Sequence, residues 1–188
     1  NKVDPSRQML AVDESIYASE RDFDAALGRA VRQNPAGRRI TVFVHGFNNN
    51  YAEGIYRAAQ MTHDLNVTST LVHFSWPSSG SPLGYIHDRD SALYSRDALA
   101  SLIEKLEKQG ASEVVLVAHS MGSLIAMEAL RQLALQGKDS AISGLSSVIL
   151  ISPDIDVDVF RSQMAAIPEP PQPFVIIGSP RDLALSIH

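Results

Sequence analysis

The sequence predicts a three-layer α/β fold, in which a mostly parallel central sheet is flanked by helices. Apolar runs of strand length alternate with amphipathic segments of helix length, the pattern typical of repeated β-α-β units. Of the 188 residues, 45% are hydrophobic, which is enough apolar material for one sizeable core. We therefore expect one domain over residues 1–188, with an irregular arm over residues 1–19.

The expected elements follow one another along the chain. An amphipathic segment over residues 20–33 predicts a helix that Asn34-Pro35 and Gly37 end. The β-branched, apolar run 40–44 predicts the first parallel strand. The remaining expected elements are a helix over 52–65, a strand over 68–76, a helix over 90–108, a strand over 114–117, a helix over 124–130, a strand over 147–151, a helix over 157–166 and a strand over 174–177.

Five residues at the end of a predicted strand, Ala118-His119-Ser120-Met121-Gly122, form the pattern of a nucleophile elbow. A serine hydroxyl is a weak nucleophile near neutral pH, so an enzyme must hold it clear of the backbone, beside a base and above N–H donors. A sharp turn from strand to helix does this, and it needs small residues two positions before and after the serine. The alternative is a serine that only caps the helix. The strand before it favours Ser120 as a nucleophile.

A second motif follows the predicted strand over residues 40–44. His45-Gly46 leads there into the polar loop Phe47-Asn48-Asn49-Asn50. Negative charge on an acyl oxygen needs two N–H donors, one from the residue after the nucleophile and one from such an earlier loop. We assign the backbone N–H groups of Met121 and Phe47 to these roles. Taken alone, the His-Gly pair is also compatible with an ordinary turn that ends a strand.

Five segments carry a resemblance to a known family: VFVHGFNN, HFSWPSSGSPLGYIHDRDSALYSRDAL, VAHSMGS, ISPDIDVDVF and SPRDLAL. Over about residues 22 to 186, the chain resembles bacterial α/β-hydrolases grouped as esterase/lipase-superfamily proteins of unknown function. The resemblance implies an α/β-hydrolase fold, a Ser-acid-His triad in that chain order and ester hydrolysis. The chain departs from the family at two places: Ala118 replaces the first glycine of the elbow, and no histidine lies at the family's distance beyond the acid.

The triad acid is expected at a strand end beyond the nucleophile, where two aspartates are available. Asp182 follows the last predicted strand, which is the usual position of the acid and the one that the resemblance supports. Its alternative role is to cap the short helical segment 183–185. Asp154 follows the preceding strand and is the second candidate.

The catalytic base is the part of the triad that the chain does not offer at an expected position. His188 is the only histidine after Ser120, and it lies six residues beyond Asp182. If a helix continued to it, this step would turn its side chain by roughly 240° from Asp182, so that the two would face different directions. We expect the natural chain to continue past His188 with the final strand and the loop that delivers the histidine. We also expect this chain to have weak or no esterase activity, whereas strong activity would make His188 the base.

Two acidic segments resemble metal sites without meeting their requirements. In the run 154–158, the sixth position of a calcium loop would be Val159 instead of glycine, and the twelfth would be Ala165 instead of glutamate. The cluster over residues 87–90 has a spacing that fits no ligand set well, and we expect it to cap the following helix. The sequence therefore predicts no metal and no cofactor.

Several residues near the two motifs are candidates for a substrate pocket. Trp76 begins a turn at the catalytic end of a strand and would form one wall of the pocket, with simple turn chemistry as the alternative. His45 belongs to the same rim. Asn48 and Tyr94 offer hydrogen bonds to a polar substrate group, although a role as surface residues fits them equally well. We expect His119 to pack near the strand end and to take no part in catalysis.

Charge and composition exclude several functions. A net charge of −5 argues against binding to nucleic acid, and the absence of cysteine excludes disulfides, thiol catalysis and thiolate metal sites. No stretch of about 18 apolar residues is present, so we expect no transmembrane segment. The chain begins with Asn1, which is compatible with a removed signal, lipid-attachment segment or upstream domain. Neither the compartment nor the oligomeric state follows from the sequence.

Together these observations predict a serine hydrolase that cleaves a small-molecule carboxylic ester without a cofactor. Ser120 attacks the carbonyl, a histidine takes and returns the proton, and Asp182 orients that histidine. Two alternatives stay open. One is a non-catalytic hydrolase-like module that binds a ligand or a protein, which the missing histidine favours. The other is an amide or thioester hydrolase with the same triad.

Overall fold

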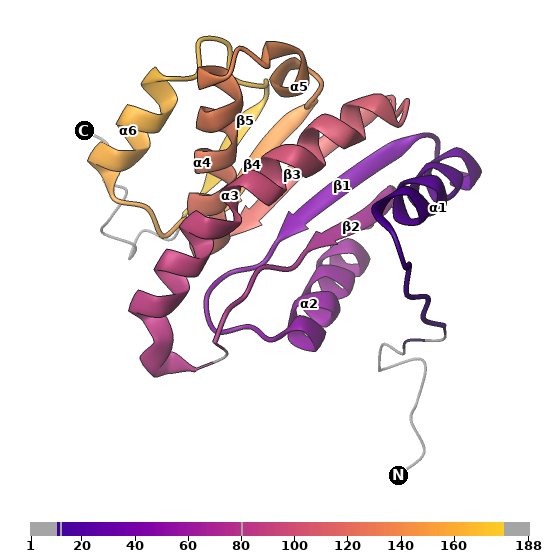
Figure 1. Ribbon diagram of the computed structural model, residues 1–188, viewed down its shortest axis with the longest axis horizontal. Coiled ribbons are helices and arrows are strands. Elements are labelled where there is room, and N and C mark those ends of the chain that lie inside the picture. The colour runs from indigo at the N-terminus through magenta and orange to yellow at the C-terminus, as the bar shows by residue number, and fades with distance from the viewer. Residues whose placement is uncertain (1–10, 12, 80, 179–188) are drawn as a thin grey trace.

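The structure is a computed structural model that describes residues 11, 13–79 and 81–178 (Figure 1). Its elements are the helices α1 (Glu20–Gln33), α2 (Tyr51–Asp64), α3 (Tyr85–Lys108), α4 (Met121–Leu135), α5 (Asp139–Ser143) and α6 (Val157–Ala165), the 3₁₀ helix η1 (Pro82–Gly84), and the strands β1 (Arg39–Val44), β2 (Thr70–Phe74), β3 (Glu113–His119), β4 (Ser147–Ile151) and β5 (Phe174–Ile177).

The five described strands form one sheet in the order β2-β1-β3-β4-β5, and every neighbouring pair is parallel. The order reverses between β1 and β3, because the chain first runs outward from β1 to β2 and then returns past β1 to β3. In parallel sheets, such a reversal leaves a crevice at the carboxyl ends of the strands, where ligands bind. Ser120 directly follows β3 and therefore lies at this crevice.

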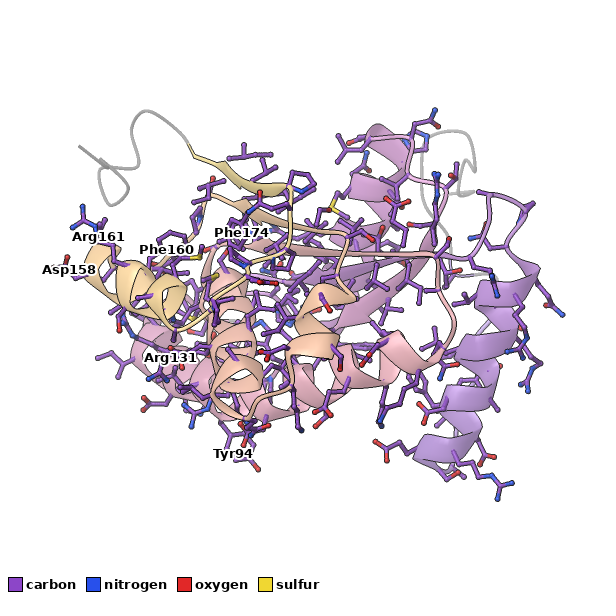
Figure 2. The ribbon with its side chains drawn as sticks, turned by 90° about the horizontal axis from the view of Figure 1, so that it is seen from above. Tyr94, Arg131, Asp158, Phe160, Arg161 and Phe174 are labelled. Carbon is purple, nitrogen blue, oxygen red and sulfur yellow. The ribbon has the colours of Figure 1, made fainter. Side chains whose placement is uncertain are left out.

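Alternate residues of each strand face opposite sides of the sheet, and the two sides are packed differently. Val42, Leu116 and Leu150 belong to a large core that helices α1, α3 and α4 cover. Phe43 and Val117 face the other side, where they pack on helix α2 in a much smaller core. Figure 1 shows α3 and α4 crossing one face of the sheet, with α2 beside β2. Near the far edge, Phe160 of α6 and Phe174 of β5 point toward one another, with ring centroids 6.4 Å apart (Figure 2).

Side-chain caps fix where two helices near the crevice begin. The Asn50 side chain accepts from the Glu53 N–H, and the Glu53 carboxylate accepts from the Asn50 N–H, each at 3.0 Å. This capping box ends the loop after β1 at a defined residue. Asp156 caps α6 by accepting from two backbone N–H groups, so this part of the acidic run 154–158 has a capping role.

Most predicted elements are confirmed, and the strands β4 and β5 have the predicted bounds. Helix α3 begins five residues earlier than predicted, so the cluster 87–90 lies inside its first turns and the prediction that it caps the helix is wrong. Asp88 is fully buried there and accepts hydrogen bonds from the Ser78 hydroxyl at 2.6 Å and the Ser79 N–H at 2.7 Å. Short helix α5 was not predicted.

Candidate active site

Ser120 is the single residue between strand β3 and helix α4, and its backbone is strained. Its φ of 51° and ψ of −125° lie in a region that residues other than glycine avoid. Three hydrogen bonds hold it there: its N–H donates to the Ile151 carbonyl at 2.9 Å, and its carbonyl accepts from the N–H groups of Ser123 and Asp154 at 2.9 and 3.2 Å. The side chain makes no capping hydrogen bond, so the helix does not occupy the hydroxyl.

The first turn of α4 packs directly on the end of β1. A Cβ on Gly122 would lie 2.5 Å from the His45 carbonyl oxygen and 2.6 Å from that of Val44. Only glycine fits at this distance, which explains the second small residue of the elbow pattern. The first small residue, Ala118, is fully buried in the large core, and its methyl group is accommodated there.

The loop after β1 also touches the elbow. A Cβ on Gly46 would lie 2.9 Å from the Ser120 Cβ, so these two residues are in direct contact. Phe47 follows Gly46, and Met121 follows Ser120, which brings their N–H groups to the same end of the sheet. Neither N–H has a hydrogen-bond acceptor among the described residues. An oxyanion needs two such N–H donors, so both groups stay candidates for this role.

The sequence predicts His45 and Trp76 as pocket residues, and in the structure both are almost fully buried beside the loop after β1. His45 is 1% exposed and Trp76 is 3% exposed, and their rings stack with centroids 5.0 Å apart. His45 Nε2 accepts from the Trp76 N–H at 3.1 Å, and Nδ1 donates to the Gly46 carbonyl at 2.9 Å. Burial lowers the pKa of His45, although the hydrogen bond to the Gly46 carbonyl opposes the shift. With both nitrogens engaged, His45 is a neutral structural residue and not a candidate base.

The other predicted pocket residues lie in different surroundings. Asn48 follows Phe47 in the loop and has a φ of 56°, a conformation that asparagine tolerates. Its neighbour Asn49 is buried and donates to the carbonyls of Gly46 and Phe47 at 3.1 and 2.8 Å. Tyr94 is 85% exposed and points away from the sheet on helix α3 (Figure 2). The structure therefore places Asn48 in the loop after β1 and does not bring Tyr94 to it.

Tyr85 links the two loops that flank Ser120, and the sequence analysis missed it. Its hydroxyl donates to the Asp154 carboxylate at 3.0 Å, and its ring meets the Phe47 ring edge-on with centroids 5.5 Å apart. Burial raises the pKa of Tyr85, and the hydrogen bond to Asp154 adds to the effect. The backbone N–H of Asp154 thus bonds the Ser120 carbonyl, while the Asp154 carboxylate accepts a hydrogen bond from Tyr85. Asp182, the first candidate for the triad acid, lies outside the described residues.

No histidine in the described part of the chain hydrogen-bonds the Ser120 hydroxyl. His119 lines a hollow of about 290 Å³ with Arg57 and Met61 of helix α2. Its pKa is lowered first by burial and then by the positive charge of Arg57. His73 lies on β2, two strands away from β3 in the sheet. His188 lies outside the described residues.

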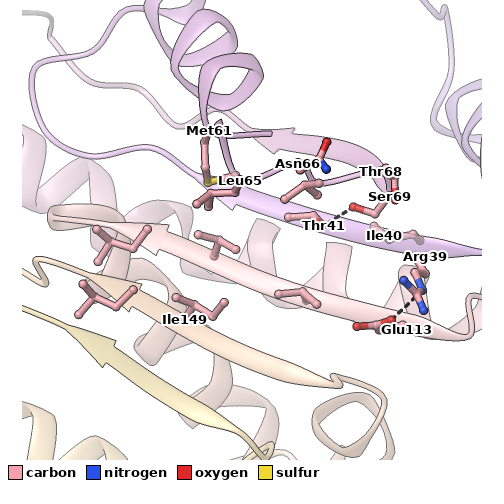
Figure 3. Close-up of a pocket in the computed structure, with 15 residues that line it drawn as sticks. Arg39, Ile40, Thr41, Met61, Leu65, Asn66, Thr68, Ser69, Glu113 and Ile149 are labelled. Carbon is pink, nitrogen blue, oxygen red and sulfur yellow. Dashed lines mark hydrogen bonds and ion pairs between the residues drawn. The ribbon is translucent and has the colours of Figure 1, made fainter. Parts of the chain in front are cut away.

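A separate apolar groove of about 340 Å³ runs over the face of the sheet beside helix α2 (Figure 3). Met61 of α2, Leu65 directly after this helix and Ile149 of β4 line it, and an ion pair between Arg39 and Glu113 lies at one end. Ser120 is not among its lining residues. The described residues contain no cluster of three or more metal-ligating side chains, and none of their helices is long and apolar enough to cross a membrane.

Comparisons with known proteins give one family match and two weaker similarities. A sequence model of a family described as "Alpha/beta hydrolase of unknown function (DUF900)" matches residues 19–188. The uncharacterized protein alr1448 of Nostoc sp. (strain PCC 7120) is 42% identical over 66 residues, which cover 35% of this chain and only 17% of that protein. A Trichoderma reesei cutinase in complex with a phosphonate inhibitor is 14% identical with a TM-score of 0.43, covering 86% of this chain and 77% of that one. Similarity at this level carries no argument about activity.

Proposed function

The chain belongs to the family of alpha/beta hydrolases of unknown function, and from this premise we propose that it is a serine hydrolase that cleaves carboxylic esters. One observation carries the proposal. Ser120 stands in a strained turn between β3 and α4 with a hydroxyl that caps nothing, in contact with the Gly46 loop. A strained residue with a free nucleophile at the carboxyl end of a parallel sheet is typical of a catalytic serine.

In the proposed reaction, the Ser120 hydroxyl attacks the ester carbonyl while a histidine takes its proton. The carbonyl oxygen becomes negatively charged in the tetrahedral intermediate and accepts hydrogen bonds from the N–H groups of Phe47 and Met121. The intermediate collapses to an acyl-serine, and the histidine returns the proton to the departing alcohol. Water then attacks the acyl-serine by the same route, which releases the acid and restores the serine.

The rest of the triad belongs to the proposal. Asp182 is the acid that orients the histidine, because it follows the last strand of the sheet. Asp154 is the second candidate, and its hydrogen bond from Tyr85 favours a structural role. No described histidine hydrogen-bonds the Ser120 hydroxyl, so the proposal assigns the base to a histidine outside residues 11, 13–79 and 81–178. The reaction needs no cofactor.

Hydrolysis of aryl esters with acyl chains of increasing length tests this function in the protein expressed from its complete gene. We expect turnover of at least one ester, and we expect Ser120→Ala to abolish it. Ser143→Ala is the matched control, because Ser143 is an exposed serine on helix α5. If the protein hydrolyses only amides or only thioesters, that class of compound is its substrate instead of an ester. No turnover of any acyl substrate would favour the non-catalytic module.

A further inference from the structure

We propose that Trp76 and His45 are positioning residues that aim the Phe47 N–H at the oxyanion. The proposal rests on the proposed function and adds to it the residues that fix the direction of the Phe47 N–H. Both residues are almost fully buried, so they act on the reaction only through the loop that carries Phe47.

The direction of the Phe47 N–H is set by the Gly46 carbonyl. Both groups belong to one planar trans peptide unit, so the N–H points opposite to the C=O. Two donors hold that carbonyl in place: His45 Nδ1 at 2.9 Å and the Asn49 side-chain amide at 3.1 Å. Asn49 also donates to the Phe47 carbonyl at 2.8 Å, which restrains the next peptide unit. The peptide plane that presents the Phe47 N–H is therefore fixed from its far side.

Trp76 sets the tautomer of His45 that can donate to the Gly46 carbonyl. The backbone N–H of Trp76 donates to His45 Nε2 at 3.1 Å, so in neutral His45 the proton must be on Nδ1, which is the nitrogen that faces the Gly46 carbonyl. The Trp76 indole N–H donates to the His45 carbonyl at 2.7 Å. The same carbonyl is the atom on which Gly122 packs. Trp76 thus sets both the tautomer of His45 and the position of its backbone.

A buried carboxylate anchors Trp76 in turn. Asp88 on helix α3 accepts from the Ser78 hydroxyl and the Ser79 N–H, which ties the segment after Trp76 to the helix. Burial alone raises the pKa of Asp88, but these hydrogen bonds outweigh it and leave the pKa below its usual value. A charged residue with no exposed surface is costly to keep in a fold unless it is paired. The buried position of Asp88 is explained by its hydrogen bonds to the segment after Trp76.

Trp76→Phe provides the sharpest test, because it removes the indole N–H and keeps an aromatic ring and the backbone N–H. We expect kcat to fall about tenfold, which corresponds to about 1.4 kcal/mol, with KM changed less than about twofold. We also expect the ¹H–¹⁵N resonance of the Phe47 amide to move. Tyr56→Phe is the control, since Tyr56 is an exposed aromatic residue on α2. If Trp76→Phe lowers only the stability of the protein and leaves the Phe47 resonance and kcat unchanged, the role of Trp76 is purely structural and the proposal is overturned.

The wild-type protein offers a second test that needs no substitution. An imidazolium cannot accept the Trp76 N–H, so protonation of His45 should shift the Phe47 amide and the fluorescence of Trp76, the only tryptophan in the sequence, with one midpoint. His73 of β2 and Asp88 of α3 are the titratable groups that act on His45, and their own midpoints must be followed alongside. A Phe47 shift that follows another group would overturn the proposal. If the wild type hydrolyses no ester, the proposed function fails, and the two spectroscopic readouts still decide the role of Trp76.

Discussion

Gly46 lies in contact with Ser120, so closely that a Cβ on Gly46 would sit 2.9 Å from the Ser120 Cβ and 2.8 Å from His119 Nδ1. The two residues belong to segments 74 positions apart in the chain, and neighbouring strands β1 and β3 bring them together. This contact joins the nucleophile elbow to the loop that carries Phe47. The residue before Phe47 and the residue before Met121 therefore meet where the strand order reverses.

Gly46→Ala should disturb this contact. A methyl group at Gly46 overlaps atoms of the Ser120 turn, and such overpacking typically destabilises a protein by about 1–3 kcal/mol. We expect a lower midpoint of urea unfolding and labelling of Ser120 by a fluorophosphonate that is at least about tenfold slower. Gly178→Ala is the control, because no described residue other than its chain neighbour has an atom within 4 Å of a Cβ at that position. Unchanged stability and labelling in Gly46→Ala would show that the contact is looser than the structure indicates.

Substitution of the two candidate acids should have unequal effects. Asp182→Asn should lower kcat by about 10⁴, because the histidine would lose the partner that sets its tautomer. Asp154→Asn should lower kcat less than about tenfold, since the Asp154 carboxylate is held by Tyr85 and only its backbone N–H bonds Ser120. Steady-state kinetics on an aryl ester measures both. The reverse order of effects would make Asp154 the triad acid.

The lowered pKa of His73 should make the stability of the protein depend on pH. Burial, with a smaller effect from the nearby His45, lowers the pKa of His73 to about 4. The unfolded chain takes up this proton near pH 6.5 and the folded chain only near pH 4, so the free energy of unfolding should fall as the pH drops between these values. His73→Phe should remove part of the decrease, whereas His63→Gln, at an exposed histidine, should not. Urea unfolding at pH 7 and pH 5 measures it, and an unchanged decrease in His73→Phe would contradict the assignment.

Local patterns predicted the strands and the elbow because both depend on neighbouring residues. The β-branched run before Ser120 and the small residues around it are visible in the sequence, and the structure has a strand and a helix there. The start of helix α3 was predicted too late, since its N-cap, Gly84, provides no side-chain hydrogen bond and so gives no start signal. The fully buried Asp88 ties this turn to the preceding loop instead.

The surroundings of Ser120 were harder to predict, because they depend on contacts between distant segments. Tyr85 and Asp154 are 69 positions apart, and nothing in either local sequence pairs them. Trp76 was expected on a pocket wall, but its indole N–H finds the His45 carbonyl and the ring is buried. Tyr94 was expected near the substrate, but its place in the helical turn directs it outward. The type of a residue limits the chemistry that it can perform, but tertiary packing decides which groups surround it.

Covalent labelling with a fluorophosphonate, followed by mass spectrometry of the intact protein and its peptides, tests the central claim most directly. The claim is that Ser120 is the nucleophile. We expect a single adduct on the peptide that contains Ser120, its loss in Ser120→Ala, its retention in Ser143→Ala, and a fall in turnover of about 10⁴ to 10⁶ in Ser120→Ala. Equal labelling of Ser120→Ala and the wild type would contradict the claim.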